Sequence, residues 1–162
     1  MPIPAYLWLK DDGGADIKGS VDVKDREGSI EIISLSHGLN LPVDSASGKI
    51  TGTRQHSPMM FEKEIDSSSP YFNRAVATGQ ALKSAEFRFY RINYSGQEEC
   101  YYKIILENVK VTSVNTAIPN TKLSSSQINH VEHVSLNYEK ITWHYMDGNV
   151  QYADAWNERK TA

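Results

Sequence analysis

Apolar and polar residues alternate along the first part of the chain with a period of two, which is typical of half-buried β-strands. Residues 5–9 form a short apolar run, residues 17–23 alternate, and residues 29–35 form a longer β-branched segment that leads to His37 and Gly38. Three such patterns in quick succession predict antiparallel strands, because short connections join neighbouring strands of opposite direction.

Turn-forming residues then interrupt the strand pattern. Residues 40–48 (NLPVDSASG) concentrate Pro, Asp, Ser and Gly, which predicts an exposed loop. Residues 49–65 are extended again, but they contain a proline, which cannot donate a hydrogen bond to a neighbouring strand. We therefore expect two strand pieces that join at Ser57 and Pro58.

The sequence DSSSP at residues 66–70 predicts the start of a helix. A serine hydroxyl can accept hydrogen bonds from the free N–H groups of a first helical turn, and proline fits the first helical position. We expect the helix to begin at Pro70, with Ser69 and Pro70 as its capping residues. Apolar positions follow at spacings of three and four, which predicts one short amphipathic helix with a stripe made of Phe72, Val76, Gly79 and Leu82.

The second half of the chain again has strand patterns separated by turn residues. Residues 85–94 and 99–115 flank the turn 95–97 and predict a hairpin. Residues 115–126 form a polar loop, and residues 128–145 predict one long strand. The pair Asp147 and Gly148 is expected to fold the tail, residues 150–156, back as a last short strand or an extended arm.

These elements predict a mainly β fold, either an antiparallel β-barrel or two packed sheets, with one short α-helix. The 162 residues are 40% apolar and 23% charged, without a linker-like tract or an internal repeat. A globule of this length can bury roughly 70% of the surface that its unfolded chain exposes. We therefore expect one domain that spans residues 1–162.

Composition argues against several partners and locations. The net charge of −3 and the scattered Lys and Arg residues argue against binding to nucleic acid or to an anionic membrane. No run approaches the roughly 18 apolar residues of a membrane-spanning helix. The start, MPIPAYLWLKDD, lacks the pattern of a secretory signal, and the single Cys100 cannot form an internal disulfide, so we expect folding in a reducing cytoplasm.

Candidate catalytic and metal-binding residues do not form a convincing set in the sequence. His130 and His133 are three positions apart on a predicted strand, so their side chains would point to opposite faces. Cys100 stands beside two tyrosines and has no basic sequence neighbour to activate its thiol. The sequence contains neither a Gly-x-Ser-x-Gly nucleophile motif nor a phosphate-binding loop. We therefore expect no enzyme activity, no cofactor and no metal.

Several segments together carry a family resemblance. Residues 63–70 (KEIDSSSP) match a Lys-x-Ile-Asp-Lys/Ser-Ser-Ser/Thr-Pro element that leads into a helix. Further similar segments follow in order and at matching spacing, namely residues 1–9, 102–109, 133–138, 140–143 and 154–157. With these motifs the chain resembles the haemolysin-coregulated protein (Hcp) family, the tube protein of bacterial type VI secretion, over nearly its whole length.

The resemblance implies a structural function. Members of this family form hexameric rings of β-barrel subunits, which stack head to tail into the inner tube of a contractile injection apparatus. The implied partners are other copies of the chain, effector proteins held in the bore, the spike-base protein and the surrounding sheath. The implied location is the bacterial cytoplasm, followed by secretion without a cleaved signal peptide.

The same resemblance suggests two functional surfaces. Ser34 and Ser36, small polar residues in an otherwise apolar segment, are candidates for the lumen wall that faces cargo. The exposed loop is expected to project toward the next ring, with contacts from Leu41, Pro42, Val43, Asp44 and Ser45. Two alternatives remain: a monomeric β-barrel that binds a small apolar ligand in a tyrosine-rich interior, and an envelope hydrolase, for which the sequence offers no nucleophile.

Overall fold

The structure is a computed structural model that describes residues 3–123 and 129–158. Within these residues it has twelve strands and one helix, which confirms the mainly β prediction. All strand pairs are antiparallel. The strands are β1 Ala5–Lys10, β2 Asp16–Ile17, β3 Ile30–Ile32, β4 Ser34–Ser36, β5 Leu39–Asn40, β6 Gln55–His56, β7 Met59–Glu64, β8 Ala81–Ile92, β9 Glu98–Ala117, β10 Val131–Asn137, β11 Lys140–Tyr145 and β12 Val150–Ala155, and the helix is α1 Ser69–Thr78.

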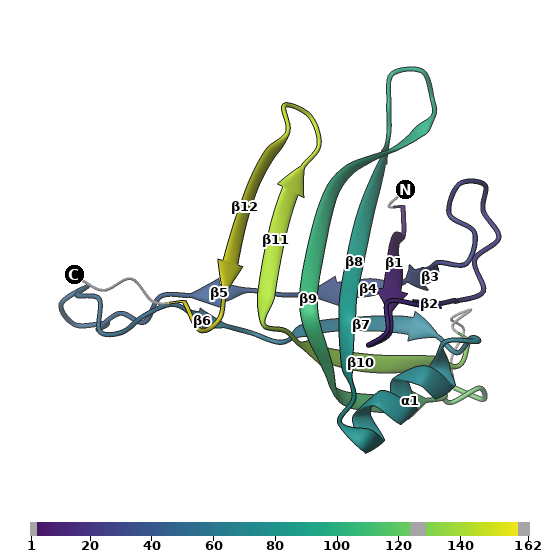
Figure 1. The fold of residues 1–162 in the computed structure, drawn as a ribbon, viewed down its shortest axis with the longest axis horizontal. Coiled ribbons are helices and arrows are strands. Elements are labelled where there is room, and N and C mark those ends of the chain that lie inside the picture. Colours follow the sequence, from purple (N-terminus) through teal and green to yellow (C-terminus); the bar gives the residue numbers. More distant parts are fainter. Residues whose placement is uncertain (1–2, 124–128, 159–162) are drawn as a thin grey trace.

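One strongly curved sheet contains ten of these strands, in an order that runs β2-β1-β8-β9-β10-β7-β4. The segment 30–36 links strands that stand near opposite ends of this order. Its first part, β3, pairs with β1, and its second part, β4, pairs with β7. Between these strands the Ile33 N–H donates to the Glu62 carbonyl at 2.8 Å. The sheet therefore curls around a core, and the two short strands β3 and β4 link its two sides. It is not a regular closed barrel (Figure 1).

Two hairpins extend from the body side by side (Figure 1). In the β8–β9 hairpin the Asn93 carboxamide oxygen accepts from the N–H groups of Ser95 and Gln97 at 2.9 and 3.0 Å, which closes the predicted turn. In the β11–β12 hairpin the turn contains Asp147 and Gly148, as predicted. The first hairpin is confirmed, and of the two forms expected for the tail, a short strand or an extended arm, the structure has the strand β12.

The predicted strand 17–23 is wrong beyond Ile17. After that residue the chain forms a loop that bonds to itself, since Gly19 N–H donates to the Gly28 carbonyl at 3.0 Å and Gly28 N–H donates to the Val21 carbonyl at 2.9 Å. Apolar alternation alone could not reveal that these backbone groups have local partners.

The predicted long strand 128–145 is also wrong, although its first residue lies outside the described part of the chain. It divides into β10 and β11 at Tyr138 and Glu139. Both halves pair with β9, β10 along its second half and β11 along its first half. Asn108 of β9 adopts a left-handed φ of 53° between these two pairings. The division lets one long strand, β9, belong to both halves of the curved sheet.

Helix α1 lies beside β9 (Figure 1) and ends at Gly79, whose φ of 70° is left-handed. Pro70 stands in the first turn, as predicted. The N-cap is Ser68 and not Ser69, and its side chain makes no capping hydrogen bond. Leu82, expected on the helix, belongs to β8. No helix in the described residues is long and apolar enough to cross a membrane.

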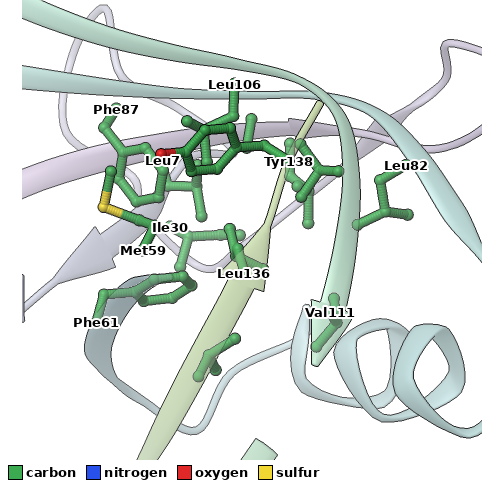
Figure 2. Packing of buried hydrophobic residues seen from close by; sticks show 14 of the residues in the cluster. Leu7, Ile30, Met59, Phe61, Leu82, Phe87, Leu106, Val111, Leu136 and Tyr138 are labelled. Carbon is green, nitrogen blue, oxygen red and sulfur yellow. The ribbon is translucent and has the colours of Figure 1, made fainter. Parts of the chain in front are cut away.

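The core fills the inside of the curved sheet and is closed by the helix. Phe61 of β7 contacts Phe72 of α1 and Phe87 of β8 edge to face, with ring centroids 6.0 and 5.5 Å apart. Figure 2 shows the surrounding side chains, which come from strands far apart in sequence and include Leu7, Ile30, Met59, Leu82, Leu106, Val111, Leu136 and Tyr138. Each of these residues is at least 95% buried, so the interior is occupied by the protein itself.

Candidate assembly surfaces

A buried charge cluster fixes the start of the helix to the sheet. Lys63 of β7 follows Met59 and Phe61 at a spacing of two and so points into the core, where its side chain is fully buried. Its ammonium group donates to Glu132 Oε1 at 3.0 Å. It also donates to the Asp66 carboxylate and to the Ser69 hydroxyl, each at 3.1 Å.

The two serines at the start of the helix take part in this arrangement. The Ser69 hydroxyl accepts from the Asp66 N–H at 3.0 Å and donates to Glu132. The Ser68 N–H donates to the Asp66 carboxylate at 2.9 Å. The predicted capping segment therefore has a different structural function: its side chains bind a buried lysine and a buried glutamate rather than the N–H groups of the first turn.

Ser34 and Ser36 lie on an exposed polar face of the sheet. Strand register places Ser34 in a row with Glu62, His133 and Asn115 across β4, β7, β10 and β9. A second row is parallel to the first and consists of Ser36, Met60, Ser135 and Ser113. Between the two rows, Phe61 and Val134 are buried, and Leu35 and Val114 are half-buried. Ser34 and Ser36 were predicted to lie on such a face, but its other members were not, because they come from distant strands.

The predicted loop forms the outer part of an arm, residues 38–54, which projects from the body in Figure 1. The arm is braced internally: Thr51 N–H donates to the Pro42 carbonyl at 2.9 Å, and Asp44 N–H donates to the Lys49 carbonyl at 2.7 Å. The Asp44 carboxylate accepts from the Ala46 N–H at 2.9 Å, a bond that lowers the pKa of Asp44. The arm is thus an ordered structure that carries exposed apolar side chains.

Exposed apolar side chains of the arm line an open groove. Leu41 and Ile50, which line it, are 49% and 57% exposed, and Val43, which lies outside its lining, is 58% exposed. The groove, of about 960 Å³, lies between the arm and the β11–β12 hairpin, where Trp143 and Tyr152 form the opposite wall. Their rings stack on each other with centroids 6.1 Å apart.

A second polar cluster lies at the base of the arm and was not predicted. His37 precedes the arm and His56 follows it, and a ring nitrogen of each lies 2.7 Å from the Tyr138 hydroxyl. The other ring nitrogen of His56 lies 2.8 Å from Asp154 Oδ2. Arg54 donates to both carboxylate oxygens of Asp154, at 2.9 and 3.1 Å. We call these five residues the arm-base cluster.

Burial and neighbouring charges shift the pKa values of four members of the arm-base cluster, one of which is Arg54, whose pKa is raised by its hydrogen bond to Asp154. Burial, followed by the nearby His56, lowers the pKa of His37. Burial also raises the pKa of the Tyr138 phenol, and the carboxylate of Asp154 adds to this increase. Hydrogen bonds from Arg54 and then from His56 lower the pKa of Asp154. The cluster therefore favours a neutral His37, a protonated phenol and an ionised carboxylate.

The other residues considered for chemistry lie apart from one another. His133 is exposed and lies 4.0 Å from Glu62 on the polar face. Cys100 is half-buried, and burial raises the pKa of its thiol, which disfavours the reactive thiolate. Among residues 3–123 and 129–158, no group of three or more His, Cys, Asp or Glu side chains is arranged to hold a metal ion.

Comparison with known proteins gives the family. The model of the family described as "Type VI secretion system effector, Hcp" matches residues 6–145. A solved structure of a mutant of the Hcp1 protein from E. coli EAEC 042 is 60% identical, with a TM-score of 0.87 over 95% of this chain and 99% of that one. A crystal structure of another Hcp protein is 25% identical, with a TM-score of 0.88 over 96% and 99% of the two chains.

A curated relative agrees with these structures. The "Major exported protein" of Pseudomonas aeruginosa strain PAO1 is 28% identical over 166 residues, which span 96% of each chain. These matches, together with the mainly β fold and the one helix of the described residues, define a type VI secretion class of protein. The chain belongs to the Hcp family, as the resemblance in its sequence indicated. It is therefore a component of a type VI secretion system.

Proposed function

We propose that this chain is the structural subunit of the type VI inner tube, in which six copies form a ring and the rings stack head to tail. Family membership supports this function, and so do the two kinds of surface on the subunit. A ring with heterologous contacts uses a different surface on each side of every subunit, and it closes when the rotation between neighbours completes a circle. The polar sheet face is the observation that carries the proposal most directly.

In this proposal the polar face lines the lumen and contacts effector proteins. Ser34 and Ser36 belong to two rows of mostly small or polar side chains, with Glu62 and His133 in the same face. A conduit needs such a wall, because a large apolar surface would bind every passing chain tightly. Small hydroxyl groups can hydrogen-bond to many cargo surfaces without strong attachment.

The arm is proposed to contact the next ring through its outer residues Leu41, Pro42, Val43, Asp44 and Ser45. Leu41 and Val43 expose apolar surface that another molecule can bury. The arm is also held in shape by its own backbone bonds, so little ordering would be needed when rings meet. An ordered, apolar projection is suited to repeated end-to-end contacts.

The remaining partners follow from the same proposal. The end of the tube would meet the spike-base protein, and its outer surface would face the contractile sheath. The chain would fold in the bacterial cytoplasm as a single domain and leave through the apparatus without a cleaved signal peptide. The name of the Pseudomonas relative, "Major exported protein", supports export of this chain as well.

The competing hypothesis of a monomeric barrel with an internal apolar ligand receives less support. The space that such a ligand would fill is occupied by Leu7, Phe87, Leu106 and other buried side chains (Figure 2). Catalysis has no positive support either, so the structural function remains the better proposal.

The lumen assignment is tested with a bulky charged residue at position 36. We expect Ser36→Arg to leave rings intact and to reduce the amount of co-expressed effector that copurifies with them. Ser95→Arg, at the exposed tip of the β8–β9 hairpin, is the matched control and should retain cargo as the wild type does. Loss of the ring in Ser36→Arg, or unchanged cargo binding, would refute the lumen assignment.

A further inference from the structure

The arm-base cluster is built from both ends of the arm. His37 lies immediately before the arm, and His56 belongs to β6, which pairs with β5 across the arm base. Leu39 pairs with His56, and the Ser57 N–H donates to the Gly38 carbonyl at 2.9 Å. A change in the hydrogen bonds of the two histidines therefore acts on both strands from which the arm emerges.

Both histidines bind the same oxygen atom, which limits how many protons the cluster accepts. A tyrosine hydroxyl has one hydrogen, so Tyr138 can donate to only one of the two imidazole rings. In one arrangement Tyr138 donates to His56 and accepts from His37. In the other it accepts from a protonated His56, which also donates to Asp154, and donates to a neutral His37. In both arrangements, each hydrogen bond that links His37, Tyr138, His56 and Asp154 has one donor and one acceptor.

A second proton cannot be accommodated in the same way. If both rings are imidazolium, both must donate to the Tyr138 oxygen, and its hydrogen loses its acceptor. Two positive charges then share one buried oxygen. His56 is 93% buried and Tyr138 is 96% buried, so a charge on the His56 ring is poorly solvated, whereas His37 is half-buried. Double protonation is therefore incompatible with the hydrogen bonds that both rings make to Tyr138.

Charged and aromatic side chains from neighbouring elements surround the two histidine rings. From β12, Asp154 faces His56, and Arg54 compensates the charge of that carboxylate. Tyr152 and Glu158 lie near Arg54, and the ring of Trp156 stacks on His56 with centroids 5.2 Å apart. On the other side, Trp143 of β11 lies 6.4 Å from the ring of His37. The single carboxylate that contacts the pair is therefore already shared with an arginine.

We propose that the arm-base cluster is a pH-sensitive latch, in which double protonation of His37 and His56 breaks their shared bond to Tyr138 and loosens the arm. The shifted pKa of His37 determines whether acid loosens or tightens the arm. The pKa of His37 in the folded protein lies below its ordinary value of 6.5. Its contribution to holding the arm is therefore complete above about pH 6.5 and is lost as the pH falls through the lower, folded pKa. This inference concerns the arm itself and stands without the ring proposal.

Hydrogen exchange of the intact protein tests the latch, with protection factors corrected for the intrinsic effect of pH. We expect the arm-base amides, those of Asn40, Gln55 and Ser57, to lose about tenfold in protection between about pH 7.5 and pH 5.5, while β8 and β9 keep theirs. Because ring assembly is measured separately by native mass, failure of the latch and failure of the proposed function give different results.

Two variants make the test specific. His37→Gln carries an amide nitrogen that can still donate to Tyr138 but cannot take up a proton, so its arm should stay protected at both pH values. The control His144→Gln changes an exposed-turn contact to Asn149 and should respond to pH as the wild type does. An unchanged pH response in His37→Gln, or a wild-type arm whose protection is independent of pH, would overturn the proposal.

Discussion

Lys63 and Glu132 lie directly opposite each other on β7 and β10, and their ion pair of 3.0 Å is almost completely buried. The exposed fractions of the two side chains are 0% and 1%. Such a pair is costly to break by removing one partner, because the other charge stays in the interior without compensation. The pair joins the sheet to the first turn of α1 through Ser69, so its effect extends to the only helix in the described residues.

Lys63→Met is therefore expected to lower the free energy of unfolding by roughly 3–5 kcal/mol, measured by urea denaturation. The control Lys140→Met removes an exposed pair with Glu107, 3.6 Å apart, and should cost less than about 1 kcal/mol. The double variant Lys63→Met/Glu132→Leu should recover part of the loss. Equal effects of Lys63→Met and Lys140→Met would show that the buried pair is not important for stability.

Gly19→Ala should also destabilise the fold, for steric reasons. A Cβ atom at this position would lie 2.5 Å from the Ser29 carbonyl oxygen and 2.8 Å from Ile30, both in the segment next to β1. We expect a loss of about 1–3 kcal/mol, visible as a lower thermal midpoint. Gly38→Ala, where nothing lies within 4 Å of the new atom, is the control and should change stability by less than about 0.5 kcal/mol. An unchanged thermal midpoint in Gly19→Ala would mean that the loop after Ile17 can shift to make room for the Cβ atom.

The ionised carboxylate of Asp154 should stabilise the fold, and this stabilisation should be lost at acidic pH when the carboxylate is protonated. Hydrogen bonds from Arg54 hold the pKa of this carboxyl below its unfolded value of about 3.9. The stabilisation is therefore present above about pH 4 and is lost as the pH falls through the folded pKa. Unfolding curves between about pH 3 and 5 should show a shallower loss in Asp154→Asn than in wild type, while the control Asp147→Asn, in the exposed β11–β12 turn, should follow the wild type. Parallel curves for all three proteins would contradict this assignment.

Val43→Asp tests the arm as a stacking surface. The side chain is 58% exposed, so the variant should fold and form rings with unchanged stability. A carboxylate buried between rings would be unpaired, so tubes seen by electron microscopy should be lost or shortened. Ile92→Asp replaces a side chain that is 60% exposed on the β8–β9 hairpin and should leave tubes intact. Tubes of normal length in Val43→Asp would remove the arm from the stacking contact.

Local signals in the sequence predicted the elements whose hydrogen bonds are also local. The turn at Asn93 to Gln97, the turn at Asp147 and Gly148, and the proline start of the helix are all of this kind. The predicted strand beyond Ile17 failed because its residues bond within a loop. The division of the long strand at Tyr138 depends on pairing with two parts of β9, which no local pattern records.

The difference between local and long-range contacts also decides which site residues the sequence predicts. Ser34 and Ser36 could be picked out because they interrupt an apolar segment, whereas their row neighbours are set by the register of distant strands. No local pattern links His37 with His56 and Tyr138, because Tyr138 lies about a hundred residues from His37. Lys63 gave one usable signal, since it continues the alternation of Met59 and Phe61 toward the buried face.

Native mass of the purified wild-type chain in dilute solution tests the central claim most directly. The tube proposal predicts particles of about six times the 18.2 kDa chain mass, which should show a central hole by negative stain. Ser95→Arg, with its changed side chain at the hairpin tip, should give the same mass. A stable monomer of 18.2 kDa at concentrations where the protein is fully folded would contradict the account.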